Sequence, residues 1–269
     1  MRATERFSSR AGHYARHRPG YPPAALELLA ARCGLTAGAA VADLGSGTGI
    51  LTRLLLERGA RVFAVEPNPP MRAAAEAALG GEPCFVSVAG TAEATTLDAD
   101  SIDLVVAGQA FHWFDAPAAR REALRILRGA GMAALLWNER PVTADGFLDE
   151  YETLLRRHAP DYDRITASRA DAASMRAFFG GTPQLETFPN QQQLDLEGLK
   201  GRVLSSSYAP EQGTPGHEPM MSELDALFRR HQRGGQVALP YVTLVYFERL
   251  TIPAPDPRAP DTASRWAWR

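Results

Sequence analysis

Short apolar runs recur through the first half of the chain, and longer segments with helical spacing of apolar residues separate them. The runs are bounded by glycine, proline or polar residues, so we expect them to form β-strands. They are AAVADL (39–44), RVFAVE (61–66), CFVSVA (84–89), IDLVVA (102–107) and MAALLW (132–137). Because they are continuously apolar, the runs are typical of strands buried on both faces of a parallel sheet.

The segments between the runs tend to begin near proline and end near glycine, as helices do. We expect helices over 23–33, 50–59, 69–81 and 116–129. Strands that alternate with helices at this spacing indicate βαβ units. The pattern therefore predicts an α/β fold, a doubly wound Rossmann-like sheet with helices on both faces. Ligands of such sheets bind beyond the carboxyl ends of the strands.

The regular alternation of strands and helices ends after Asn138, where the pattern predicts a helical insertion and further strands. We expect helices over 144–159, 168–179 and 218–235. Strands are expected over 184–194 and over 236–250, the second interrupted at Pro240. The final stretch is rich in proline and is expected to be extended or disordered.

Composition excludes several classes of function. The chain has 269 residues, with 29 basic and 31 acidic side chains, and this balance argues against a nucleic-acid partner. No run approaches the roughly 18 apolar residues of a membrane span, and the first residues lack the apolar core of a signal peptide. We therefore expect a soluble, cytoplasmic protein. Its two cysteines, Cys33 and Cys84, are too few for a disulfide framework, and the six histidines lack metal-ligand spacing.

The stretch DLGSGTG (43–49) follows the first expected strand and precedes a helix. A glycine-rich turn at this place lets backbone approach a ligand, and both dinucleotides and S-adenosylmethionine (SAM) bind to such turns. Gly45 and Gly47 fit the dinucleotide fingerprint, but Ile50 stands where that fingerprint needs a third small residue. An acidic residue, Asp43, stands two places before the first glycine.

The pattern DLGSGTG resembles motif I of the class I SAM-dependent methyltransferases. The next expected strand ends in Glu66, placed like the acidic residue that binds ribose hydroxyls, and VFAVEPNPPM (62–71) resembles the second motif of that family. The NPP within it is interpreted as a helix start. The resemblance implies a first set of cofactor-binding residues, namely Asp43, Gly45, Ser46, Gly47, Glu66, Pro67 and Met71.

Further stretches resemble the type-11, small-molecule branch of these enzymes, which includes proteins similar to trans-aconitate methyltransferase. GTAEAT (90–95) stands where that branch contacts adenine, AGQAFHWFD (107–115) where the methyl group lies, and YARHRPGYP (14–22) where a segment closes over SAM. Thr91 replaces the usual Asp, so an acidic contact to adenine comes from Glu93 or is absent. The resemblance implies further cofactor contacts by Tyr14, Arg18, Thr91, Ala92, Glu93, Gln109, Ala110, Phe111 and Trp113, with Arg18 facing the SAM carboxylate.

His112 is the candidate catalytic residue, since an imidazole in the loop after the fourth strand can take a proton from an acceptor. The alternative is that His112 only shapes the pocket between Phe111 and Trp113. The aromatic rings around it suit a sulfonium cation, or else pack in the core.

The sequence thus predicts SAM-dependent methyl transfer to an oxygen, nitrogen or carbon atom of a small molecule. The alternatives are a non-catalytic SAM-binding module and an NAD-dependent oxidoreductase. The expected parts are an N-terminal lid and helix (1–36), a SAM-binding core (37–138), substrate-side helices with the final strands (139–252) and a proline-rich tail (253–269).

Overall fold

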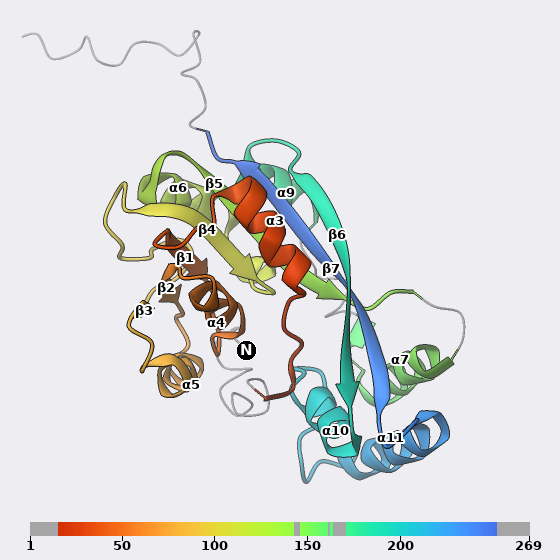
Figure 1. The fold of residues 1–269 in the computed structure, drawn as a ribbon. Helices are drawn as coiled ribbons and strands as arrows, with labels where there is room; N and C mark the ends of the chain where they lie inside the picture. The colour runs from red at the N-terminus through yellow and green to blue at the C-terminus, as the bar shows by residue number, and fades with distance from the viewer. Residues whose placement is uncertain (1–15, 143–145, 161, 164–170, 252–269) are drawn as a thin grey trace, which may run out of the picture.

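The computed structural model describes residues 16–142, 146–160, 162–163 and 171–251 (Figure 1). Seven strands form one sheet in the order β3-β2-β1-β4-β5-β7-β6. The strands are β1 (Ala40–Leu44), β2 (Arg61–Val65), β3 (Phe85–Val88), β4 (Ile102–Gly108), β5 (Leu127–Glu139), β6 (Gln184–Leu194) and β7 (Val237–Arg249). The prediction of a doubly wound α/β sheet is confirmed.

The first five strands are parallel, and the last two are not. β7 lies between β5 and β6 and pairs antiparallel with both, so the sheet is mixed rather than wholly parallel. The expected interruption at Pro240 is wrong, because β7 continues through it, opposite Gln191. Since β5 ends opposite Val242, the strand at Pro240 pairs on one side only, where a proline is tolerated.

Helices cover both faces of the sheet, because the continuously apolar strands bury side chains on both sides. On one face, α3 (Pro23–Cys33) and α4 (Ile50–Glu57) pack Leu29 and Leu55 against strand residues such as Val41. On the other face, α6 (Ala116–Ile126) and α9 (Ala172–Phe179) pack against residues such as Ala42. A further helix, α5 (Pro69–Leu79), begins at the NPP stretch, where the Asn68 side chain caps it.

A third apolar cluster holds a helical layer at one end of the molecule. It consists of α7 (Gly146–His158), α10 (Leu196–Leu204) and α11 (His217–His231), packed against the far ends of the paired strands β6 and β7 (Figure 1). The pattern did not predict α10, whose sequence LEGLKGRVL contains two glycines and a weak apolar stripe. It begins where the Asp195 side chain accepts a hydrogen bond from the backbone N–H of Gly198.

Other expected boundaries shift by a few residues. The helix expected over 116–129 ends at Ile126, because Leu127 already belongs to β5, and a 3₁₀ turn forms at Phe111–Trp113. The proline-rich tail lies outside the described residues. Within the part of the chain that the structure describes, no helix is long and apolar enough to cross a bilayer, and no three His, Cys, Asp or Glu residues cluster as metal ligands do.

Candidate active site

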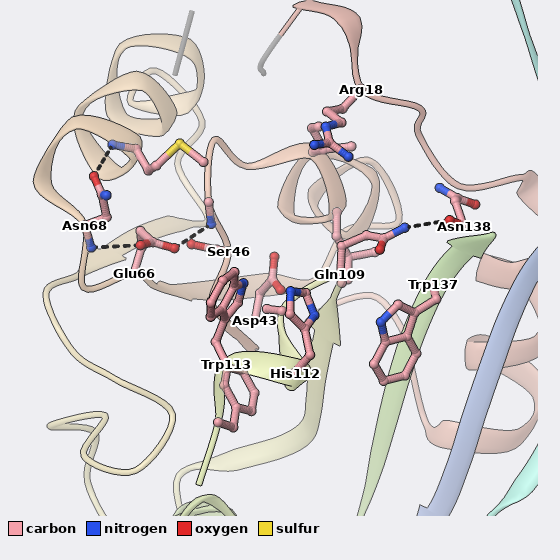
Figure 2. Close-up of a pocket in the computed structure, with 18 of the residues that line it drawn as sticks. Arg18, Asp43, Ser46, Glu66, Asn68, Gln109, His112, Trp113, Trp137 and Asn138 are labelled. Carbon is pink, nitrogen blue, oxygen red and sulfur yellow. Dashed lines mark hydrogen bonds between the residues drawn. The ribbon is translucent and has the colours of Figure 1, made fainter. Parts of the chain in front are cut away.

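The carboxyl ends of β1, β2, β4 and β5 open onto a cavity of about 410 Å³ (Figure 2). This is where a doubly wound sheet binds its ligands. Most of the residues that the sequence singled out meet there: Arg18, Asp43, Gly45, Ser46, Gly47, Glu66, Pro67, Met71, Thr91, Ala92, Glu93, Gln109, Ala110, His112 and Trp113. Tyr14 lies outside the described residues.

The glycine turn between β1 and α4 requires glycine for two different reasons. Gly45 has φ 67°, and a Cβ there would lie 2.6 Å from Cβ of Ala110. Gly47 has φ 59°, and its Cβ would meet only Cε of Met71, at 3.8 Å, so backbone conformation rather than space selects glycine. The turn is held by N–H groups of Gly45 and Ser46, which both donate to the carbonyl of Val65. It therefore presents bare backbone to the cavity.

Glu66, just beyond β2, ties the turn to the start of α5. One carboxylate oxygen accepts from the N–H of Gly47 at 2.9 Å, and the other accepts from the N–H of Asn68 at 2.8 Å (Figure 2). Burial raises the pKa of Glu66, against the lowering effect of these two hydrogen bonds. Each carboxylate oxygen can accept a second hydrogen bond, so the group remains able to bind a ligand hydroxyl.

Asp43, at the end of β1, is fully buried beneath the turn. Its Oδ2 accepts from the Thr52 hydroxyl at 2.6 Å, while Oδ1 has no partner among the described residues. Burial raises the pKa of Asp43 to about 7, although the Thr52 hydrogen bond opposes the shift. The Ser46 hydroxyl likewise has no partner among the described residues. Unpartnered buried polar atoms beside a bare turn fit a polar ligand.

The loop after β3 lines the part of the cavity next to Glu66. It folds back through a bridge between Thr91 and Ala94, and Ala92 is buried. Glu93 lines the cavity, and its Oε1 accepts from the N–H of Asp115 at 2.9 Å. The adenine contact expected of Glu93 stays a prediction, and the hydrogen bond to Asp115 engages one of its two carboxylate oxygens.

The aromatic residues in the loop after β4 lie in two different environments, the cavity and the core. Gln109 has φ 57°, rare for a non-glycine residue, and its Nε2 donates to the carbonyl of Asn138 at 3.1 Å. His112 and Trp113 line the cavity and contact each other, with ring centroids 4.8 Å apart. Phe111 does not line it: its ring is buried against Trp137 and Phe178 in the core. The structure thus does not place Phe111 with the other proposed cofactor contacts.

The wall opposite the glycine turn contains residues that the sequence reasoning did not single out. They are Trp137, Asn138 and Arg140, in and after β5, and Arg202 and Tyr208, in and after α10. Ligands of a parallel sheet bind beyond the carboxyl ends of its strands, and this rule predicted Gln109. Asn138 also stands at the end of a strand, so the sequence could have indicated it. Tyr208 lies in SSSYAPEQG (205–213), a stretch that also resembles the type-11 branch, whereas Arg202 had no signal, because only the packing of α10 brings it to the cavity.

The segment before α3 forms the remaining wall. Arg18 and Tyr21 line the cavity, and Arg18 Nη2 donates to the carbonyl of Ser205 at 3.0 Å. The carbonyl of Gly20 accepts from Nδ2 of Asn138 and from Nδ2 of Asn190. Hydrogen bonds therefore connect the segment to β5, to β6 and to the end of α10.

Comparison with known proteins assigns the chain to a family. A model of the methyltransferase domain matches residues 42–135, which carry the glycine turn and the next four strands. An uncharacterised methyltransferase of Mycobacterium tuberculosis is 35% identical over 238 residues, which cover 88% of this chain and 93% of that protein. The chain belongs to the methyltransferase family.

More distant relatives agree with this assignment. The methyltransferase is 26% identical to an uncharacterised methyltransferase-like protein of Schizosaccharomyces pombe over 245 residues, covering 89% of this chain and 93% of that protein. A provisionally named type II methyltransferase from Anaeromyxobacter dehalogenans shares the fold, with a TM-score of 0.61 at 21% identity over 87% of this chain and 98% of that one. The predicted resemblance to class I SAM-dependent methyltransferases is confirmed.

Proposed function

We propose that this methyltransferase transfers the methyl group of SAM to a small-molecule acceptor within the cavity. One observation carries the proposal. A single cavity joins the glycine turn, Asp43 and Glu66 at one end to Asn138, Arg202 and Tyr208 at the other. In this proposal SAM occupies the first end, the methyl acceptor occupies the second end, and the two meet beside His112 and Trp137.

The residues at the first end fit SAM. Glu66 would bind the ribose hydroxyls, the loop around Ala92 would contact adenine, and Arg18 would face the carboxylate of the methionine part. The bare backbone at Gly47 and the unpartnered Oδ1 of Asp43 face the same space. When bound, SAM supplies a methyl group on a sulfonium sulfur, which is already a good leaving group.

The protein then contributes mainly by aligning the acceptor with the methyl group, because the leaving group needs little activation. His112, Trp113 and Trp137 line the cavity, and their aromatic rings suit a cation. The indole N–H of Trp137 is buried without a partner among the described residues, so it is available to donate to an acceptor. His112 would act as the base if the acceptor must lose a proton.

The test is the formation of S-adenosylhomocysteine from SAM in the presence of hydroxyl, amine and carbon-acid acceptors. We expect turnover with one small-molecule class and a SAM affinity that falls about tenfold or more in Glu66→Ala, since hydrogen bonds to a charged group contribute about 1.5–3 kcal/mol. Glu76→Ala, a change on the exposed face of α5, is the matched control. Tight SAM binding without transfer to any acceptor would support the non-catalytic module instead.

A further inference from the structure

Arg202 is a buried guanidinium on the acceptor side of the cavity. Only 3% of the residue is exposed, and it lines the cavity from α10. Its Nε donates to the Tyr241 hydroxyl at 2.9 Å and its Nη1 to the Ser206 hydroxyl at 3.0 Å. No carboxylate among the described residues pairs with it. Arg202 therefore donates its hydrogen bonds to neutral hydroxyl groups, and no carboxylate among the described residues compensates its positive charge.

A second guanidinium lines the same end but has a partner. Arg140 forms an ion pair with Glu152, and its Nη2 donates to the Tyr162 hydroxyl at 2.6 Å. Glu152 thus compensates the charge of Arg140, whereas no carboxylate among the described residues compensates that of Arg202. Arg18, the third arginine of the cavity, is already assigned to the carboxylate of SAM.

Tyr208, which follows α10, lies in the field of this excess charge. Burial alone would raise the pKa of Tyr208, but Arg140, Arg202, a hydrogen bond with Ser206 and, to a lesser extent, Arg18 lower it to about 8. The neighbouring phenols of Tyr151 and Tyr241 are the other ionisable groups near Arg202. Among the described residues, the groups named here thus offer Arg202 a phenol, and no carboxylate, as a counter-ion.

A buried charge without a counter-ion is costly, and buried arginines are normally paired. An unpaired one that lines a ligand cavity indicates that the ligand brings the missing charge. The planar guanidinium fork matches a carboxylate through two parallel hydrogen bonds. A single excess charge suits a singly charged carboxylate better than a phosphate ester.

We propose that Arg202, together with Arg140 and Tyr208, binds a carboxylate of the methyl acceptor. The inference rests on the proposed methyl transfer and narrows its substrate class to organic acids. The carboxylate is held in its charged form, so its role is to anchor the molecule and orient the remainder toward His112 and Trp137.

The test uses the full chain saturated with S-adenosylhomocysteine and pairs of probes that differ only in charge. Benzoate with benzamide and hexanoate with hexanamide are such pairs, and phenyl phosphate tests the phosphate alternative. Calorimetry should show each acid binding about 10–100-fold more tightly than its amide, and benzoate more tightly than phenyl phosphate. Arg202→Gln should abolish the preference and leave the affinity for S-adenosylhomocysteine within twofold.

The control is Arg157→Gln, which removes an exposed arginine paired with Glu223 and should keep the preference for acids. If Arg202→Gln does not fold, Arg202→Met serves instead, because replacing a buried charge by an apolar side chain is often tolerated. A second readout is the absorbance of the Tyr208 phenolate. A bound acid, but not its amide, should move that titration to higher pH, and Tyr208→Phe should remove the signal.

Four outcomes would overturn the proposal. They are equal binding of acid and amide or no binding of either, a preference that survives in Arg202→Gln, and a loss of S-adenosylhomocysteine affinity in that variant. The last would assign Arg202 to the cofactor. A native protein that does not bind S-adenosylhomocysteine would instead refute the proposed function itself, before any acid is added.

Discussion

At the scale of single residues, the role of the glycine turn can be tested by comparing substitutions at two glycines. Gly47 and Gly129 share the same φ of 59°, and neither has a close neighbour that a Cβ would strike, but only Gly47 lines the cavity. Valine at either position must adopt a strained left-handed backbone, which costs about 1–3 kcal/mol of stability. We expect calorimetry to show SAM binding lost in Gly47→Val and retained in Gly129→Val. Equal affinity in the two variants would contradict the assigned role of the turn.

Asp43 predicts a pH dependence of stability. Its pKa is raised by burial from the ordinary value of 3.8 to about 7, so between these values the folded protein holds a proton that the unfolded chain has released. The contribution of Asp43 to the free energy of unfolding therefore decreases as pH rises from about 4 to about 7. Denaturant unfolding across this range should show a smaller decrease in Asp43→Asn than in the native chain.

The exposed Asp149 provides the control for that experiment. Asp149→Asn should keep the native pH dependence, because its carboxylate is not buried. Parallel stability curves for the native chain and Asp43→Asn would show that the Asp43 carboxyl titrates normally.

His112 is tested by rate rather than by binding. If it is the base, His112→Ala should lower kcat by about 10²–10⁴-fold and remove one ionisation from the pH profile of kcat. If it only shapes the cavity beside Trp113, apparent binding should change more than kcat. With a saturating acceptor and rate-limiting chemistry, a decrease below about fivefold with an unchanged profile would exclude the base.

At the scale of elements, the segment before α3 is predicted to close over the cofactor. It contains the described part of the expected lid, and Asn138 and Asn190 hold it by its Gly20 carbonyl. Hydrogen exchange over 16–21 should slow when S-adenosylhomocysteine binds, because an ordered segment protects its amides. Asn190→Ala should speed that exchange, whereas Gln191→Ala, a change at the exposed neighbour, should not. Identical exchange with and without the ligand would rule out closure.

At the scale of the whole molecule, the cofactor should stabilise the fold, because the proposed contacts to it lie in loops after four strands. At about 100 times its Kd, S-adenosylhomocysteine should add roughly 2.7 kcal/mol, or about 5–10 °C in Tm for a chain of this size. NAD at equal concentration should leave Tm unchanged, since Ile50 occupies the place of a third small residue. A larger shift with NAD would favour the oxidoreductase.

The local sequence pattern determined the alternation of strands and helices, the glycine turn and the position of Glu66 at the end of β2. These features depend on the spacing of apolar residues and on the backbone preferences of glycine and proline, which act over a few neighbouring residues. The rule that ligands bind beyond the carboxyl ends of the strands then placed most of the candidate residues in one cavity. It applies because parallel strands end at the same edge of a sheet.

Only the tertiary structure decided the antiparallel placement of β7, the formation of α10 and the burial of Phe111 in the core. It also decided that Arg202 and Tyr208 face the same cavity as Asp43, about 160 residues earlier in the chain. The physical reason is that these features depend on packing between segments far apart in sequence. Periodicity shows that a residue is on an apolar or polar face, but not which distant segment covers that face.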